Sequence, residues 1–216
     1  MTREEIIQEF HKIYYDEGNR SSIINSTRWM GVLLQKCPLD LWIYQEIMFK
    51  ARPTMIIETG SLHGGSGLWF AHMLDIIHGS ADHFVLSIDI NADMSRPDHY
   101  SVLFKQGSSV SPEIIQYVSR WVEKYKTVMV VLDSDHRANH VYQELELYSK
   151  FVTPGSYLIL EDTNINGHPV LNGWGAGPME ALEAWLPKHP EFEVDKSREK
   201  LLCTMNPGGF LRRKIC

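Results

Sequence analysis

The sequence predicts an α/β protein built on a doubly wound, Rossmann-like parallel sheet. From residue 53 onward, short apolar runs alternate with longer amphipathic stretches, as strands and helices do in such folds. Residues 127–133 form an apolar run rich in Val, as a central parallel strand requires when both of its faces are covered. A glycine-rich turn joins the first strand to the first helix, and turns of this kind open nucleotide-type cofactor sites.

The first fifty residues predict a helical cap in front of this sheet. Residues 2–17 carry apolar side chains at helical spacing, and Thr2 followed by Glu5 makes a capping box at the start of the helix. A second helix is expected over residues 39–50, with Asp40 as its N-cap. The chain is therefore divided into an N-terminal helical cap, residues 1–52, and a core, residues 53–216, within one compact domain.

The core is expected to alternate strands and helices along its length. The predicted strands cover residues 54–58, 83–90, 101–105, 127–133, 156–161, 192–194 and 201–205, and residues 208–216 form a tail or a last edge strand. The predicted helices cover residues 66–77, 112–125, 138–151 and 178–186, with Ser111 as the N-cap of the second. The loop over residues 164–177 is rich in Gly and Asn, and we expect it, with Trp174, to shape a substrate pocket.

Composition limits the classes of function. With 216 residues, 44% hydrophobic and 22% charged, the chain resembles an ordinary globular domain. A formal net charge of −6 argues against non-specific nucleic-acid binding, which needs a basic face. No apolar run approaches the roughly 20 residues of a membrane span. The three cysteines are far apart and lack metal-type spacing, so we expect no disulfide frame and a cytoplasmic location.

The glycine-rich turn predicts the kind of cofactor. From Gly60 its spacing is G-x-x-x-G-G-x-G, which is not the dinucleotide fingerprint, and Glu58 lies two residues before the first glycine. A carboxylate there would repel a pyrophosphate, but it suits a positively charged ligand such as S-adenosylmethionine (SAM). The alternative is a tight strand-to-helix connection without a ligand.

Two further segments suit the nucleoside part of such a cofactor. Asp89 ends the second predicted strand, where an acid holds ribose hydroxyls in nucleotide-binding sheets. Capping of the following turn is its alternative role. Residues 107–109 lie where the third strand would bring groups to an adenine ring.

Acids at the ends of the later strands predict a metal site. Asp133 ends one strand, and Glu161 with Asp162 ends the next. Carboxylates gathered at one edge repel each other unless a cation is present, and oxygen ligands suit Mg²⁺ or another hard divalent cation. His136 lies three residues after Asp133 and is a candidate general base for a metal-bound hydroxyl. Taken singly, a strand-end Asp is often a helix cap and a lone His is usually structural.

Five segments together resemble the cephalosporin hydroxylase-like family: Ile57-Glu-Thr-Gly-Ser-Leu-His-Gly-Gly-Ser66, Ser87-Ile-Asp-Ile90, Gly107-Ser-Ser109, Leu132-Asp-Ser-Asp-His136 and Leu160-Glu-Asp-Thr163. The resemblance extends over residues 28–190, with Trp29-x-Gly31 and Lys36-x-Pro-x-Asp-x-Trp42 similar to the segment that precedes the family's core. Members of that family are SAM- and Mg²⁺-dependent O-methyltransferases of cephamycin biosynthesis, with relatives that act on macrolide sugars and rhamnosyl groups.

The resemblance implies a role for each candidate residue. It implies His136 as the catalytic base and Asp133, Glu161 and Asp162 as metal ligands. The residues that it places around SAM, together with neighbours in the same turns, are Glu58, Gly60, Ser61, His63, Ser66, Asp89, Ile90, Gly107, Ser108, Ser109 and Asp133.

The sequence thus predicts a SAM- and divalent-metal-dependent O-methyltransferase that acts on a hydroxyl of a small natural product or sugar, in a homo-oligomer. A catechol-type O-methyltransferase shares the strand-end acids, but it usually has Lys in place of His136 and an Asp-Asn pair in place of Glu161-Asp162. A hydroxylase would need a redox metal, and His136, His140 and His168 show no clear two-His-one-carboxylate arrangement. A non-catalytic partner protein with this fold would have no reason to keep the acids together with His136.

Overall fold

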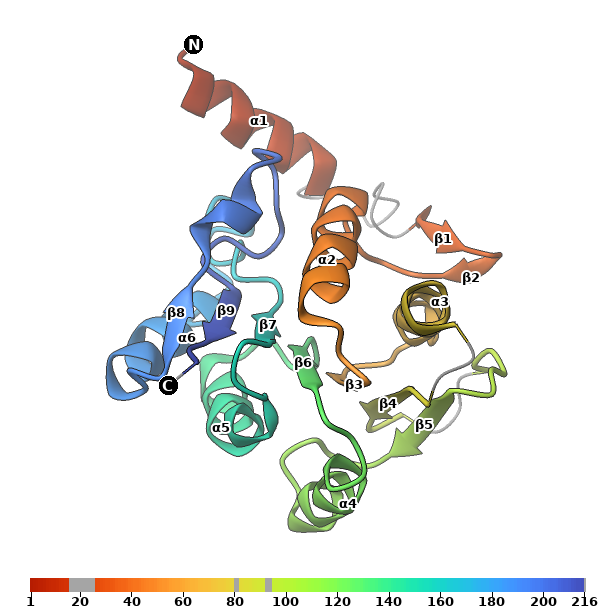
Figure 1. Ribbon diagram of the computed structural model, residues 1–216. Helices are drawn as coiled ribbons and strands as arrows, with labels where there is room; N and C mark the ends of the chain where they lie inside the picture. The colour runs from red at the N-terminus through yellow and green to blue at the C-terminus, as the bar shows by residue number, and fades with distance from the viewer. Residues whose placement is uncertain (16–25, 80–81, 92–94, 216) are drawn as a thin grey trace.

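A seven-stranded sheet forms the centre of the molecule. The computed structural model describes residues 1–15, 26–79, 82–91 and 95–215. The strands are β3 (Met55–Thr59), β4 (Phe84–Asp89), β5 (Val102–Gln106), β6 (Val128–Leu132), β7 (Tyr157–Leu160), β8 (Phe192–Val194) and β9 (Phe210–Arg213), in the spatial order β5-β4-β3-β6-β7-β9-β8. The first five are parallel, and β9 pairs antiparallel with both β7 and β8 (Figure 1). The predicted doubly wound fold is confirmed.

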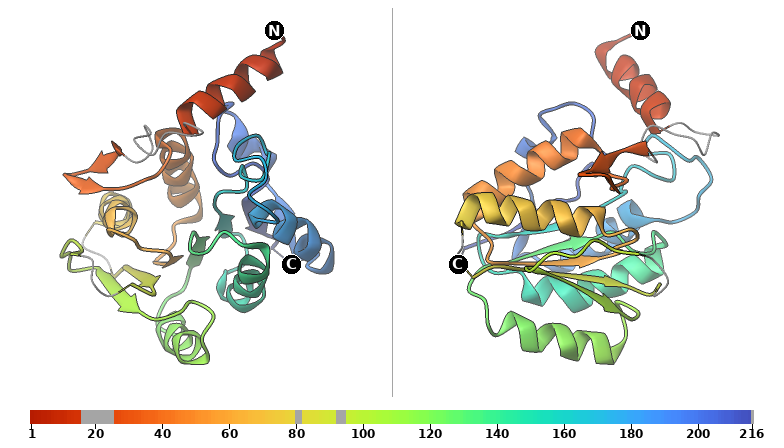
Figure 2. Two further views of the ribbon diagram at one scale, coloured as in Figure 1. Left: turned by 180° about the vertical axis from the view of Figure 1, so that it is seen from behind. Right: turned by 90° about the vertical axis from the view of Figure 1, so that its right-hand side faces the viewer.

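Helices cover both faces of this sheet. On one face lie α2 (Pro38–Ala51) and α3 (Gly65–His78), and on the other lie α4 (Pro112–Val122), α5 (Ala138–Tyr148) and α6 (Pro178–Trp185), as the right-hand view of Figure 2 shows for all but α6. Short 3-10 turns follow as η2 (Ser149–Phe151), η3 (Leu186–Lys188) and η4 (Lys196–Glu199). Each strand contributes alternate side chains to the two cores, because successive side chains point to opposite faces.

The two cores are densely apolar. Ile56, Met129 and Ile159 pack under α2 and α3, while Ile57, Val130 and Leu158 pack under α4, α5 and α6. All six side chains are buried, as expected for parallel strands covered on both sides. The sheet is therefore a rigid platform for whatever lies at its edges.

The N-terminal elements lie beside α2 and α3. Helix α1 (Arg3–Tyr15) projects from the body of the molecule, and a small hairpin of β1 (Arg28–Trp29) and β2 (Val32–Leu33) leads into α2 (Figure 1). The expected capping box is present, since the Glu5 backbone N–H donates to the Thr2 hydroxyl over 3.2 Å. The last two residues of the predicted helix, 16 and 17, lie outside the described residues. Helix α2, which belongs to the predicted cap, packs directly on the sheet. The boundary between cap and core at residue 52 stays a prediction.

Three expectations about individual elements are wrong. Asp40 is not the N-cap of α2; Cys37 occupies that position, and the buried Asp40 carboxylate accepts a hydrogen bond from the Met205 backbone N–H over 2.8 Å. That bond holds residues 201–205 in a loop, with Leu202 at a φ of 73°, so they form no strand. The last strand is β9, which lies between β7 and β8 and not at the edge of the sheet.

Among the described residues, no helix has the length and hydrophobicity needed to cross a bilayer.

Candidate cofactor and metal site

The site lies at the carboxyl ends of β3 and β6, where the order of the parallel strands reverses. The chain runs from β3 outward through β4 to β5, then returns to place β6 on the other side of β3. Ligands bind at such a switch point in open α/β sheets, because the loops on its two sides diverge and leave a crevice.

Gly60 brings the two strand ends close together. Its φ is +85°, and a Cβ at this position would lie 1.7 Å from the backbone carbonyl oxygen of Asp133. Any side chain would therefore push the β3 turn away from the end of β6. The Asp133 backbone N–H also donates to the Thr59 carbonyl over 3.1 Å, and this bond holds the end of β6 against the end of β3.

Glu58 lies beneath this turn and is fully buried. Its Oε2 atom accepts a hydrogen bond from the Ser87 hydroxyl, while its Oε1 atom has no hydrogen-bond partner in the described part of the chain. Burial raises the pKa of Glu58, and the positive charge of Lys36 opposes that rise. An unpartnered buried carboxylate oxygen fits a ligand that brings a positive charge or a donor to it.

Asp89 fixes the neighbouring loop. Its Oδ2 atom accepts from the backbone N–H of Leu62 over 2.7 Å, and its Oδ1 atom accepts from that of Asn91 over 2.8 Å. The Asp89 carboxylate thus holds the turn at Leu62 and the turn at Asn91. It lies at the end of β4, as predicted.

Two connected cavities extend along this edge. The first, of about 300 Å³, contains the predicted nucleoside residues and is lined by Gly60, Ile88, Asp89, Ile90, Gly107, Ser108, Ser109, Ser134, Asp135 and His140. The second, of about 440 Å³, includes Gly60, Ser61, His63, Ser66, Asp89, Ile90, Asp133, His136 and Asp162 in its lining. They share Gly60, Asp89, Ile90 and Ser134, so they form one continuous crevice. All residues predicted to bind the cofactor line it except Glu58, which lies behind its wall.

Ser61 adds a second unpartnered group. The side chain is buried, and its hydroxyl has no hydrogen-bond partner among the described residues. Because Ser61 lines the second cavity, its hydroxyl is free to meet a ligand carboxylate or amine there. This observation and the free Glu58 oxygen fit the amino-acid end of SAM.

Three side chains at the far end of the crevice form a candidate metal group. Asp133, His136 and Asp162 each offer a ligand atom, and these atoms lie within 4.8 Å of one another. His136 Nε2 is 3.2 Å from Asp162 Oδ2 and 3.9 Å from Asp133 Oδ1. Burial raises the pKa of Asp162, and the charge of His136 opposes it. Asp162 has a φ of 54° and its backbone N–H donates to Asn206 Oδ1 over 3.0 Å, which holds the side chain towards the crevice.

Lys36 is a site residue to which sequence reasoning assigned no role. Its Nζ atom lies 2.6 Å from Asp133 Oδ2 and 2.6 Å from Glu161 Oε1, and only 2% of the side chain is exposed. Burial alone would lower the pKa of Lys36, but the two carboxylates raise it well above its usual value. The lysine is therefore a permanent cation beneath the acid cluster. The sequence signal that could have identified it was a single charged residue in the mostly apolar run of residues 32–38.

This lysine changes the setting of Glu161. Glu161 and Asp133 both contact the ammonium of Lys36, which lies between them. Asp162 lies near Asp133 on the side of the crevice, together with His136. The three predicted metal ligands and Lys36 together carry two net negative charges when ionised, which one divalent cation would balance. The donor set of carboxylates fits the predicted hard cation.

His140 is a second residue that the sequence analysis did not place in the cofactor site. Its Nε2 atom lies 3.1 Å from the Ser109 hydroxyl and 3.2 Å from the Ser134 hydroxyl, in the nucleoside cavity. Hydrogen bonding to the buried Glu144 raises the pKa of His140, and burial opposes it. The four-residue spacing of His140 and Glu144, which places them on one face of a helix, was the sequence signal that could have paired these two residues.

Comparisons with known proteins agree with this site. The sequence profile of the rhamnosyl O-methyltransferase/CmcI family matches residues 21–214. A rhamnosyl O-methyltransferase of Mycobacterium leprae is 41% identical over 217 residues, covering 97% of this chain and 91% of the relative. One of Mycobacterium tuberculosis is 38% identical over 214 residues, covering 96% and 85%.

Solved structures show the same fold. A structure of CmcI with Mg and SAM has a TM-score of 0.68 at 20% identity and covers 90% of this chain and 79% of that one. A structure of the MycE methyltransferase with Mg and SAH has a TM-score of 0.51 at 15% identity, covering 80% and 48%. The matches together confirm the predicted family and enzyme class, a SAM-dependent O-methyltransferase.

Proposed function

The chain belongs to the rhamnosyl O-methyltransferase/CmcI family, and we propose that it transfers the SAM methyl group to a hydroxyl of a rhamnosyl or similar sugar. The observation that supports this most is the continuity of the crevice. The predicted cofactor residues and the group of Asp133, His136 and Asp162 line the same cavity, so donor and acceptor sites adjoin. The sugar acceptor is inferred from the two mycobacterial relatives named as rhamnosyl O-methyltransferases.

The cofactor end of the crevice holds SAM in this proposal. The hydroxyl of Ser61 receives the amino-acid end, and the buried Glu58 carboxylate lies behind the wall of the crevice with one oxygen free. Asp89 meets the ribose, and Ser108 and Ser109 border the adenine. Gly60, His63, Ser66, Ile90 and Gly107 shape the walls between them.

The acid end holds one divalent cation. Asp133 and Asp162 are the ligands on the open side, and Glu161 is the third carboxylate, held by Lys36. When bound, SAM supplies an electrophilic methyl group, and the cation lowers the pKa of a nearby hydroxyl. The protein positions SAM and the cation next to each other in one crevice and limits the access of water to them.

His136 is the general base in this reading. Its imidazole lines the crevice with Nε2 beside Asp162, so the other ring nitrogen, Nδ1, is the atom that would take the proton of a hydroxyl placed there. Histidine changes its protonation near neutral pH, which suits removal of a hydroxyl proton. Asp162, at 3.2 Å, orients the imidazole and stabilises the charge that it gains.

The test combines methyl transfer with metal binding. With methyl-labelled SAM and methyl α-L-rhamnopyranoside as acceptor, His136→Ala is expected to lower kcat by about 10²–10⁴-fold. Its Mg²⁺ affinity, measured by calorimetry, stays unchanged if His136 is a base and falls if it is a ligand. EDTA is expected to abolish transfer by the unaltered protein.

His189→Ala is a matched control for that substitution. The His189 side chain is 18% exposed, against 26% for His136, and it too lies between two carboxylates, Glu146 at 3.1 Å and Glu191 at 3.3 Å. It is remote from the crevice, so its loss should leave kcat within about twofold. Near-normal turnover by His136→Ala would contradict the base assignment. A catechol-type enzyme would methylate catechol and not the rhamnoside, and a hydroxylase would consume O₂.

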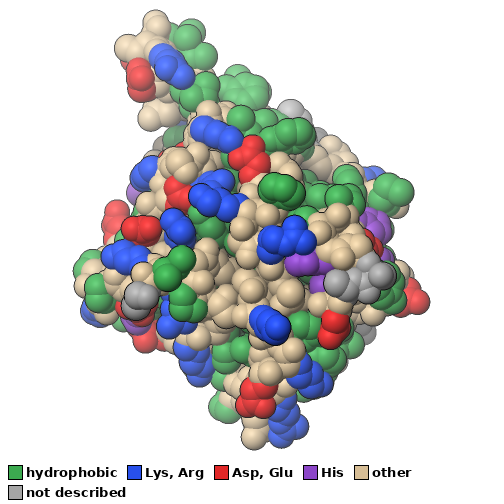
Figure 3. Space-filling model, viewed as in Figure 1, with side chains coloured by type: hydrophobic (Ala, Val, Ile, Leu, Met, Phe, Trp, Pro, Cys, Tyr) green, Lys and Arg blue, Asp and Glu red, His purple; other side chains and the backbone are tan. Residues whose placement is uncertain are grey.

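We also propose a cytoplasmic homo-oligomer. Cys37 and Cys203 are free and buried, as in a protein of a reducing compartment. Large apolar side chains are exposed on α1 and at the C-terminal end of α2, namely Phe10, Ile13 and Phe49, and hydrophobic side chains gather on this side of the surface (Figure 3). Light scattering should show a multimer that Phe49→Asp dissociates.

A further inference from the structure

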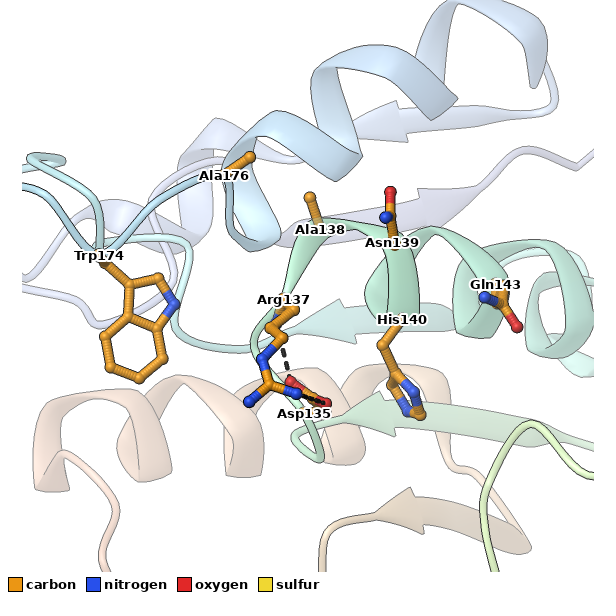
Figure 4. A pocket seen from close by; sticks show the side chains of 8 residues that line it. All are labelled: Asp135, Arg137, Ala138, Asn139, His140, Gln143, Trp174 and Ala176. Carbon is orange, nitrogen blue, oxygen red and sulfur yellow. Dashed lines mark hydrogen bonds and ion pairs between the residues drawn. The ribbon is translucent and has the colours of Figure 1, made fainter.

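A third cavity, of about 680 Å³, lies beside the crevice. Its lining includes Asp135, Arg137, Asn139, Gln143 and Trp174 (Figure 4). It shares Asp135 and His140 with the nucleoside cavity, and its lining includes Asp135 and Arg137, the residues on either side of His136 in the chain. The proposed catalytic base thus lies in the chain between two residues of the third cavity.

Trp174 forms one wall of this cavity and is half exposed. Its neighbour Gly175 donates a backbone hydrogen bond to Asn166 Oδ1 over 3.1 Å, and Asn166 Nδ2 donates to Glu180 Oε1 over 2.7 Å. The backbone N–H of Gly177 donates to the other Glu180 oxygen, also over 2.7 Å. These hydrogen bonds hold the loop around Trp174, whose ring is left half exposed.

The charge state of Glu180 supports this anchoring. Burial would raise the pKa of Glu180, but hydrogen bonds from the Gly177 N–H and Asn166 lower it to about 2. The carboxylate is thus ionised at any physiological pH, and it accepts all of these bonds. The Ala138 backbone N–H also donates to the Ala176 carbonyl over 3.0 Å, which joins the loop to the start of α5.

The wall opposite Trp174 consists of planar polar side chains. Arg137 and Asp135 form an ion pair of 3.4 Å, and Arg137 is 81% exposed, so its remaining N–H groups are accessible. Asn139 and Gln143 lie one turn apart on α5. Carboxylate, guanidinium and carboxamide groups together offer donors and acceptors for hydroxyls. The charges of Asp135 and Arg137 cancel, and His140, the other titratable residue of the lining, pairs with Glu144, so the lining suits a neutral ligand and not a phosphate.

We propose that this cavity is a second glycosyl subsite, which binds the sugar ring next to the one that is methylated. Its chemistry is that of a pyranose site, with one aromatic face for the C–H side of a ring and polar groups for its hydroxyls. This inference rests on the proposed function, since it takes the reacting ring to lie beside His136. The acceptor is then a glycan or glycoconjugate of at least two sugar units, with the second ring over Trp174.

The test compares two acceptors in two variants. The acceptors are methyl α-L-rhamnopyranoside and the methyl glycoside of a rhamnose disaccharide. For the unaltered protein, the disaccharide should have a kcat/KM about 10-fold higher, mostly through a lower KM. Trp174→Ala should remove this advantage and leave the monosaccharide unaffected. Trp42→Ala is the control, because Trp42 is similarly exposed, at 61% against 50%, but lies on α2.

A second readout does not depend on methyl transfer. Titration with the disaccharide should quench tryptophan fluorescence in the unaltered protein and in Trp42→Ala, but not in Trp174→Ala. Asn139→Ala should weaken the same titration without removing the fluorophore.

Three results would overturn the subsite. One is a disaccharide that is no better than the monosaccharide. Another is quenching that persists in Trp174→Ala. The third is an equal Trp174-dependent advantage for p-nitrophenyl α-L-rhamnopyranoside, which would assign the cavity to an aryl aglycone. If neither rhamnoside is methylated, the proposed function fails, and the fluorescence titration still decides whether the subsite exists.

Discussion

The two halves of the carboxyl edge satisfy their acids in different ways. In the cofactor half, Asp89 accepts from two backbone N–H groups, and Glu58 accepts from the hydroxyl of Ser87. In the acid half, Asp133 and Glu161 both contact the ammonium of Lys36, and Asp162 lies beside His136. The shortest contacts of the cofactor-half carboxylates are therefore with neutral donors, and Arg96 lies farther away, 3.8 Å from Asp89, while the acid half has cations in direct contact.

This difference matches the ligands that each half is proposed to take. Neutral donors fix the Glu58 and Asp89 carboxyl groups in space, where they can meet an amine or ribose hydroxyls. Carboxylates clustered without a cation would repel each other and take up protons. A built-in lysine reduces that repulsion, and a divalent cation removes what is left.

The largest effect should follow from removing the buried lysine. Lys36→Met keeps the length of the side chain but leaves Asp133 and Glu161 without their cation. Breaking a buried ion pair on one side costs about 3–5 kcal/mol. Urea unfolding should show that loss of stability without Mg²⁺, and saturating Mg²⁺ should restore more stability to this variant than it adds to the unaltered protein.

Lys200→Met is the matched control. Lys200 pairs with Glu46 at the same distance, 2.6 Å, but its side chain is 49% exposed. An exposed pair contributes at most about 1 kcal/mol. Equal losses in the two variants would mean that the acid half gains nothing from its lysine, and the contrast between the halves would fail.

Single substitutions in each half should separate the two ligands. Asp162→Asn is expected to lower Mg²⁺ affinity by about 100-fold, since loss of an outer partner alone costs 10–100-fold, and to leave SAM affinity unchanged. Asp89→Asn should lower SAM affinity by about 10-fold, because charged hydrogen bonds to the ligand and to the turn are weakened. Its Mg²⁺ affinity should stay the same. Calorimetry with each ligand alone tests both, and a crossed result would contradict the division.

The smallest effect concerns a titrating side chain of the cofactor half, His140. The groups that face it are Glu144, Asp135 and Arg137, and Glu144 raises its pKa above the usual 6.5. The pair therefore stabilises the folded protein fully below about pH 6.5, and this contribution is lost as the pH rises through the raised pKa. Glu144→Gln should reduce stability more at pH 6 than at pH 9. A difference that grows with pH would have the wrong sign.

The sequence predicted the parts of the site that follow from strand order. Glu58, Asp89 and Asp133 each end a parallel strand, and the carboxyl ends of parallel strands must share one edge, so their proximity could be inferred without coordinates. The glycines of the first turn were informative for a similar reason, because only a close approach such as that of Gly60 to Asp133 requires them.

The sequence could not predict contacts that depend on how distant segments pack. Lys36 precedes the strand and helix alternation and meets Asp133 across 97 residues. Residues 201–205 have the composition of a strand, but the Asp40 carboxylate binds their backbone and keeps them out of the sheet. In both cases the deciding partner is a buried charge on a segment before the core, and local pattern carries no information about it.

The origin of Lys36 has a consequence for how this enzyme can be divided. A fragment that begins at residue 53 would retain all seven strands of the central sheet and every acid of the proposed catalytic edge. It would lack the ammonium between Asp133 and Glu161 and the Asp40 carboxyl group that binds the backbone of the loop before β9. The proposed metal site would then carry an uncompensated negative charge, and that loop would lose a contact. The minimal catalytic unit is therefore expected to begin before Lys36, and any chimera that exchanges acceptor specificity should carry that leading segment together with the sheet.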